Sequence, residues 1–198
     1  MNRPQTLAPR GQRQNEGNFW RNTAGAAAVE FVLWTSIMVL PILSAVDIAY
    51  YAYQRMQVEV AAQAAAQAAF QTCDPMTQLP AASKCAGVLT KMTEAAQSTT
   101  LGSAVTFATP PIEGYYCVDN AHQMILMGTS EPILAAGGTA PTAPNPFNCD
   151  GVVPGSSSLP GDYVSVTVTH SFTPIFSGIS VAQLLSTEIH KTAWMRLS

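Results

Sequence analysis

The sequence has little charge, few histidines and none of the short motifs that mark common enzyme sites. Only 11% of its 198 residues are charged, against about a quarter in an average soluble domain. It contains no P-loop, no dinucleotide-binding glycine fingerprint and no H-E-x-x-H motif. His122, His170 and His190 are isolated from one another, and the serine run at 156–158 lacks the G-x-S-x-G elbow of a hydrolase nucleophile. We therefore expect no enzyme activity, no cofactor and no small-molecule substrate.

The few charges are unevenly distributed along the chain. Residues 1–25 contain four arginines and one glutamate, whereas residues 56–198 contain four basic and nine acidic residues. The acidic portion offers no electrostatic footprint for nucleic acid. A basic segment on one side of an apolar run and an acidic one on the other is typical of a chain that crosses a membrane.

Residues 26–46 form an apolar run whose only charged side chain is Glu30. As a helix this run would rise about 30 Å, which matches the hydrocarbon core of a bilayer. Tyrosines at 50, 51 and 53 resemble the aromatic belt at a membrane interface. Because Lys and Arg favour the cytoplasmic side, the sequence predicts a single-pass protein with residues 1–25 in the cytoplasm. A buried core helix and a secretory signal are the alternatives, but a signal has a shorter apolar region.

Glu30 needs an explanation, because a carboxylate inside a bilayer is costly and usually functional. Small residues precede it, and Gly25 lies five positions before it. In these features the sequence resembles the TadE-like pseudopilins of tight-adherence (Flp-type, type IVb-related) pilus systems. The resemblance is best over residues 21–70 and weaker in the C-terminal tail.

This resemblance implies that a prepilin peptidase cleaves the chain between Gly25 and Ala26, on the cytoplasmic side of the inner membrane. Glycine suits the position because a side chain there would obstruct the approach of a protease to the backbone. After cleavage Glu30 becomes the fifth residue and, by resemblance, meets the N-terminal ammonium of a neighbouring subunit. Such a pair offsets two desolvation costs in a low-dielectric layer. The alternative is that Glu30 snorkels to the inner interface.

Beyond the apolar run the same helix should continue to Thr72, since no breaker occurs before Asp74-Pro75. Its alanine-rich part, residues 54–70, is smooth enough to pack against other helices, or to cover the chain's own outer domain, and the two interpretations are compatible. Residues 73–198 then form an extracytoplasmic domain, which gives an α+β, pilin-like architecture with an antiparallel sheet.

Within the outer domain the sequence predicts one amphipathic helix, several strands and one long loop. Ser83 can cap the helix and Gly102 can terminate it. Six glycines and six prolines fall in residues 128–161, which we expect to be a turn-rich surface loop. The expected helix spans 83–101, and the expected strands span 104–108, 115–118, 122–127, 163–169 and 188–197.

Four cysteines, Cys73, Cys85, Cys117 and Cys149, all follow the apolar run. The periplasm is oxidising, so two disulfides are expected, and three pairings are possible. We prefer Cys73 with Cys85, which bracket a proline-containing turn, and Cys117 with Cys149, which would staple the long loop. Zinc binding is the alternative, but no C-x-x-C spacing or neighbouring histidine pair supports it.

The sequence thus favours a pseudopilin, a structural component for the biogenesis of an adhesive pilus. Its expected partners are the prepilin peptidase, other pilins and pseudopilins, the inner-membrane assembly platform and the lipid bilayer. An uncleaved, membrane-anchored periplasmic binding module is the main alternative, and a membrane-tethered enzyme has no supporting set of residues.

Overall fold

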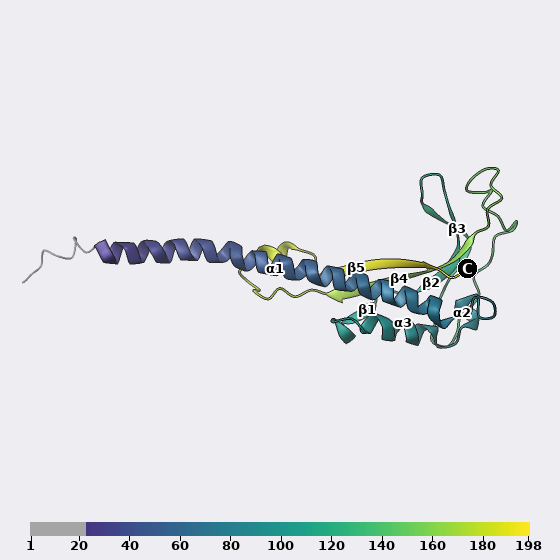
Figure 1. Ribbon diagram of the computed structural model, residues 1–198, viewed down its shortest axis with the longest axis horizontal. Coiled ribbons are helices and arrows are strands. Elements are labelled where there is room, and N and C mark those ends of the chain that lie inside the picture. The colour runs from purple at the N-terminus through teal and green to yellow at the C-terminus, as the bar shows by residue number, and fades with distance from the viewer. Residues whose placement is uncertain (1–22) are drawn as a thin grey trace, which may run out of the picture.

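A single long helix organises the molecule. The computed structural model describes residues 23–198, and in it α1 runs from Thr23 to Thr72 (Figure 1). Its 50 residues give a length of about 75 Å. Pro41 lies inside the helix, which continues past it without interruption. The expected helix from 26 to 72 is confirmed, whereas the predicted leader lies outside the described residues except for its last three.

The outer domain contains one antiparallel sheet that is centred on β4. One edge of β4 pairs with β5 over nine residue pairs, and its other edge pairs with β1 near one end and with β2 near the other. Strand β3 extends the sheet beyond β2 as the second arm of a hairpin. The strands are β1 (Val105–Phe107), β2 (Ile112–Val118), β3 (Met124–Pro132), β4 (Gly161–Ser171) and β5 (Glu188–Arg196). The expected α+β class and antiparallel pairing are confirmed.

The second half of α1 packs directly on this sheet. Alternating valines of β4, Val164, Val166 and Val168, are fully buried, because strand side chains two positions apart share a face. Helix α3 (Val88–Gln97) lies beside the same part of α1 and contributes Met92 to the core. On α1 the buried side chains recur every three or four residues, at Val58, Ala61, Ala62, Ala65, Ala66 and Ala69.

The helix predicted for residues 83–101 is broken into two pieces. The structure has α2 at Ala81–Lys84 and α3 at Val88–Gln97, separated by a short break. Cys85 is held there by a disulfide, and Gly87 has a φ of 78°, a left-handed conformation that favours glycine. The prediction of Ser83 as a cap was therefore wrong, as was Gly102 as a terminator, because Gly102 begins a 3-10 turn after the helix has ended.

The loop predicted for residues 128–161 is also shorter than expected. Strand β3 continues to Pro132, because Ser130, Glu131 and Pro132 pair with the start of β2. Gly128 allows this path, since its φ is 94° and a side chain there would collide with the carbonyl of Thr142. The strand expected from His122 begins instead at Met124, and His122 lies in the preceding turn with a φ of 61°.

Candidate functional site

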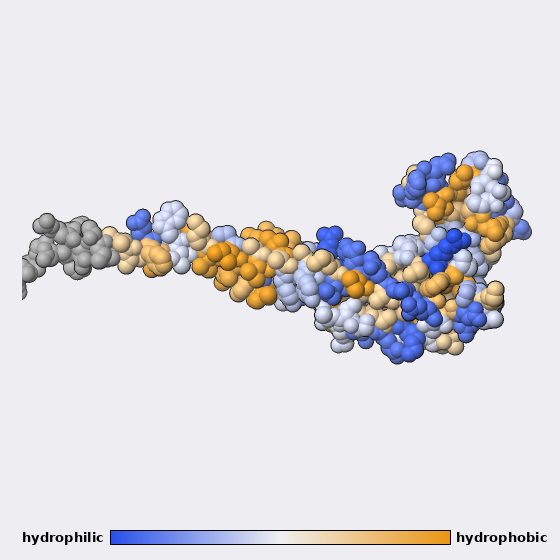
Figure 2. All heavy atoms as spheres, in the orientation of Figure 1, coloured by the Kyte–Doolittle hydropathy of each residue, from blue (hydrophilic) through white to orange (hydrophobic). Residues whose placement is uncertain are grey.

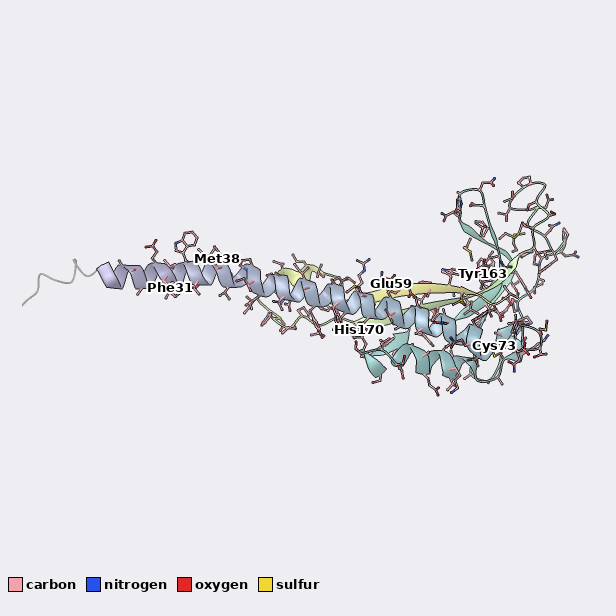
Figure 3. The ribbon with its side chains drawn as sticks, in the orientation of Figure 1. Phe31, Met38, Glu59, Cys73, Tyr163 and His170 are labelled. Atoms are coloured by element: carbon pink, nitrogen blue, oxygen red, sulfur yellow. A yellow bond between two sulfur atoms is a disulfide. The ribbon has the colours of Figure 1, made fainter. Side chains whose placement is uncertain are left out.

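The first half of α1 has no cover from the rest of the described chain. Every residue from 25 to 42 is exposed, and Phe31 has 71% of its surface accessible. Figure 3 shows Phe31 and Met38 projecting from a helix that has no other element beside it. The hydroxyls of Thr35 and Ser36 donate to the carbonyls four residues earlier, at 2.7 and 2.9 Å, so they present little polarity to an apolar solvent. This part of α1 is long and apolar enough to cross a membrane once.

The residues expected to govern processing and subunit register lie at the start of this bare helix. Gly25 is already helical, and open space surrounds the position that a Cβ would occupy. Ala26 and Glu30 are both exposed. The structure therefore places the Gly25–Ala26 bond and the Glu30 carboxylate on the same accessible helix, where another molecule can reach them.

Asp47 lies where the bare part of α1 meets the outer domain, and it is completely buried. Its carboxylate accepts hydrogen bonds from the backbone N–H groups of Ile175, at 2.9 Å, and Phe176, at 3.3 Å. One turn earlier, the Ser44 hydroxyl accepts from the N–H of Val181 at 3.5 Å. The connection between β4 and β5 is therefore fastened to α1 by side chains of the helix.

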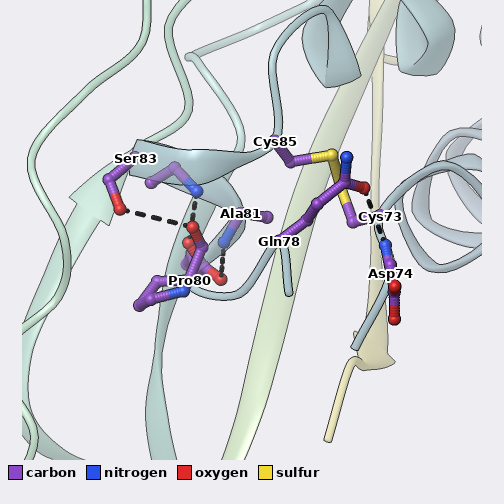
Figure 4. Close-up of a disulfide and its surroundings, with 9 residues drawn as sticks. Cys73, Asp74, Gln78, Pro80, Ala81, Ser83 and Cys85 are labelled. Atoms are coloured by element: carbon purple, nitrogen blue, oxygen red, sulfur yellow. Dashed lines mark hydrogen bonds between the residues drawn. A yellow bond between two sulfur atoms is a disulfide. The ribbon is translucent and has the colours of Figure 1, made fainter. Parts of the chain in front are cut away.

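The structure pairs the cysteines in the combination that the sequence analysis preferred. Cys73, just beyond the end of α1, is bonded to Cys85, and Cys117 of β2 is bonded to Cys149 in the long loop. Figure 4 shows the first bridge, with Gln78 beside it accepting a 2.9 Å hydrogen bond from the N–H of Asp74. The bridge closes the turn between α1 and α2, so it fixes how the chain leaves the long helix.

A buried pair of carboxyl groups, Glu113 on β2 and Asp162 on β4, is the most unusual electrostatic feature of the outer domain. Glu113 is fully buried and accepts hydrogen bonds of 2.6 Å from the N–H groups of both Ala81 and Ala82. Asp162 is 2% exposed and lies close enough to Glu113 to feel its charge. Burial, together with the nearby charge of Glu113, raises the pKa of Asp162 to about 7. Asp162 therefore gains a proton in the folded protein as the pH falls through about 7, while the Glu113 carboxyl ties α2 to the sheet.

Asp162→Asn is expected to remove the contribution of this carboxyl group to the pH dependence of the free energy of unfolding. Because the pKa of Asp162 rises from 3.8 to about 7 on folding, the folded protein keeps a proton that the unfolded chain releases between these values. The stabilisation that the Asp162 proton contributes is complete below about pH 4 and is lost as the pH rises through 7. Asparagine does not titrate, so the variant should gain stability relative to the wild type as the pH rises from 5 to 8.

Urea unfolding at several pH values measures this effect in detergent-solubilised full-length protein. Glu94→Gln, which removes an exposed carboxylate on α3, is the control. An unfolding free energy of Asp162→Asn that follows the wild-type pH profile would contradict the raised pKa.

The histidines and the serine run noted in the sequence lie in different surroundings. His170 is buried with Nδ1 3.1 Å from the carbonyl oxygen of Ala104, whereas His190 is exposed beside Glu188. The hydroxyl groups of Ser156 and Ser158 hydrogen-bond to each other in the loop, at 2.7 Å. Between residues 23 and 198 no group of three His, Cys, Asp or Glu side chains is placed to hold a metal ion.

These features define a class of protein with a long N-terminal apolar helix, compatible with a single-pass membrane anchor, that carries an α+β domain on the C-terminal half of this helix. A family model described as TadE-like protein matches residues 25–67. The match starts at Gly25 and covers the bare part of α1 and most of its alanine-rich part, so the resemblance to TadE-like proteins is confirmed for this helix. No curated protein and no solved structure matches the chain.

Proposed function

We propose that the protein is a pseudopilin of a tight-adherence, Flp-type pilus system, a structural component without enzyme activity. It is inserted once in the inner membrane, with residues 1–25 in the cytoplasm and residues 73–198 in the periplasm. One observation carries the proposal: the TadE-like match falls on a continuous helix that is bare where it would cross the membrane and buried in its own domain beyond it.

The proposed mechanism is assembly through α1. The prepilin peptidase removes residues 1–25, and the new ammonium group at Ala26 is then available to pair with Glu30 of a neighbouring pilin. In the membrane this ion pair sets the axial register between subunits, because each charge alone is costly in a low-dielectric layer. The exposed side chains Val29, Phe31 and Trp34 supply the apolar surface that packs against the neighbour or lipid.

Replacement of Gly25 by isoleucine is expected to block processing. The helix has room for the side chain, so the folded protein should be unchanged while the peptidase loses access to the bond. Cleavage is measured from the intact mass and the N-terminal sequence of the membrane-bound protein. The protein is purified from host strains with and without the prepilin peptidase. The wild type should begin at Ala26 only when the peptidase is present, and Gly25→Ile should retain residues 1–25 in both strains.

Glu30→Val is the matched variant, which should be cleaved normally but reduce the number of pili. Thr35→Val, which removes a hydroxyl from the same bare helix, serves as the control and should leave pili unchanged. If Glu30→Val left pilus formation intact, the pairing role would be wrong. If the wild-type protein kept its leader in the presence of the peptidase, it would instead be an uncleaved, membrane-anchored binding module.

A further inference from the structure

The connection between β4 and β5 extends away from the sheet toward the bare part of α1. In Figure 1 its short 3-10 helix, η3 (Val181–Leu184), lies beside α1 at the level where the outer domain ends. The hydrogen bonds to Asp47 and Ser44 fix this position, although the partners are more than 120 residues apart in the chain. The connection is therefore a defined element of the structure.

The composition of this connection is unusual for a surface loop. Residues 172–187 contain no charged side chain. Ile175, Ile179 and Val181 are each more than half exposed, and Leu184 is 88% exposed. Figure 2 shows the hydrophobic surface at this level of the molecule. Several large apolar side chains exposed together, with no charge among them, are typical of a surface that contacts another apolar phase.

The position of the connection along α1 indicates that this apolar phase is the lipid bilayer. From Ala26 to Ser44 the helix rises about 27 Å, close to the thickness of a bilayer hydrocarbon core. The connection therefore lies at the interface on the periplasmic side of the membrane that α1 spans, where the lipid headgroups meet the acyl chains. On α1 at the same level, Val46 and Ile48, which flank the buried Asp47, are also exposed.

The burial of Asp47 supports the same assignment. Between Glu30 and Arg55 it is the only charged residue of α1, and a bare carboxylate at this depth would favour water over lipid. The backbone N–H groups of the connection satisfy it and leave none of its surface exposed. The loop thus supplies apolar side chains to the interface and removes the one charge that would oppose it.

We propose that the β4–β5 connection is a second membrane-contacting element, which inserts Ile179, Val181 and Leu184 into the interfacial layer of the bilayer that α1 spans. This inference rests on the single-pass anchoring in the proposed function. It gives the outer domain two contacts with the membrane, and this restricts the tilt of the domain about α1.

Fluorescent labels in the full-length protein test the proposal directly. All four native cysteines form disulfides, so a single introduced cysteine can carry an environment-sensitive dye. The protein is reconstituted in vesicles of phosphatidylcholine and phosphatidylglycerol that contain lipids with a nitroxide either near the headgroup or deep in the acyl chain. Leu184→Cys reports the connection, Met38→Cys reports the span and Ser157→Cys reports an exposed loop elsewhere in the domain.

The dye at position 184 should show blue-shifted emission and be quenched several-fold more strongly than the dye at 157, most effectively by the shallow nitroxide. The dye at 38 should be quenched best by the deep nitroxide. If 184 behaved like 157 while 38 was quenched, the second membrane contact would be wrong and the anchor would stand. If 38 was not quenched, the anchoring itself would be wrong, and with it this inference.

A second pair of variants separates insertion from mere proximity to lipid. Leu184→Glu is introduced into protein labelled at Ile179→Cys, and it should reduce quenching by the shallow nitroxide several-fold because the new charge favours water. Met76→Glu is the matched control, since Met76 is 93% exposed in the turn that follows the opposite end of α1. Equal quenching in the two variants would overturn insertion of the connection.

Discussion

Glu113→Ala is expected to lower the free energy of unfolding of the outer domain by about 3 kcal/mol. The substitution leaves the N–H groups of Ala81 and Ala82 without their acceptor in a buried site, and each orphaned donor costs about 1–3 kcal/mol. It also leaves a cavity beside Asp162, because the Glu113 side chain is fully buried. Part of this loss is offset because Asp162 no longer faces a neighbouring carboxylate. Urea unfolding of the solubilised full-length protein, followed by near-ultraviolet circular dichroism, measures the change.

Two further variants test whether the loss of stability comes from the hydrogen bonds that Glu113 accepts. Glu113→Gln keeps the volume but offers one oxygen and turns an NH₂ group toward a backbone N–H, so its loss should be intermediate. Glu94→Ala removes a carboxylate that is 59% exposed and should cost little. A midpoint for Glu113→Ala equal to that of Glu94→Ala would mean that Glu113 does not hold α2 to the sheet.

The elements that the sequence predicts well are those with a long, uninterrupted pattern. Helix α1 follows from an apolar run joined to an alanine-rich run without a breaker, and β4 follows from the alternation of Val164, Val166 and Val168. In both, local preference and tertiary packing favour the same conformation. The boundaries of α3 were missed because Gly87 and the bridge at Cys85 interrupt a pattern that reads as helix.

The burial of Asp47, Glu113 and Asp162 was not predicted from the sequence, although the pattern around Asp162 indicates it. Asp162 is in phase with the inward-facing valines of β4, so the same alternation that predicts the strand places this side chain in the core. Glu113 and Asp47 left no such signal. Their partners are backbone N–H groups, 31 residues or more away in the chain, that no side-chain pattern reveals.

The sequence also left open whether the alanine-rich part of α1 covers its own domain or packs against other subunits. The structure divides the two roles between faces of one helix. Alanines at 61, 62, 65, 66 and 69 are buried against the sheet and α3, whereas Val60, Gln63 and Phe70 are exposed. The buried face serves the chain's own core, and only the exposed face remains available to a neighbour.

Ala65→Phe tests this division and should lower the free energy of unfolding by about 3 kcal/mol, at the upper end of the usual cost of overpacking a core. Ala65 is fully buried on the part of α1 that packs against the sheet and α3, and the small side chain suits such close packing. Ala52→Phe, at an exposed position of the same helix, is the control and should leave the urea midpoint unchanged. If the alanines served mainly in subunit packing, Ala65→Phe would instead retain wild-type stability in solubilised monomers and fail only in pilus assembly.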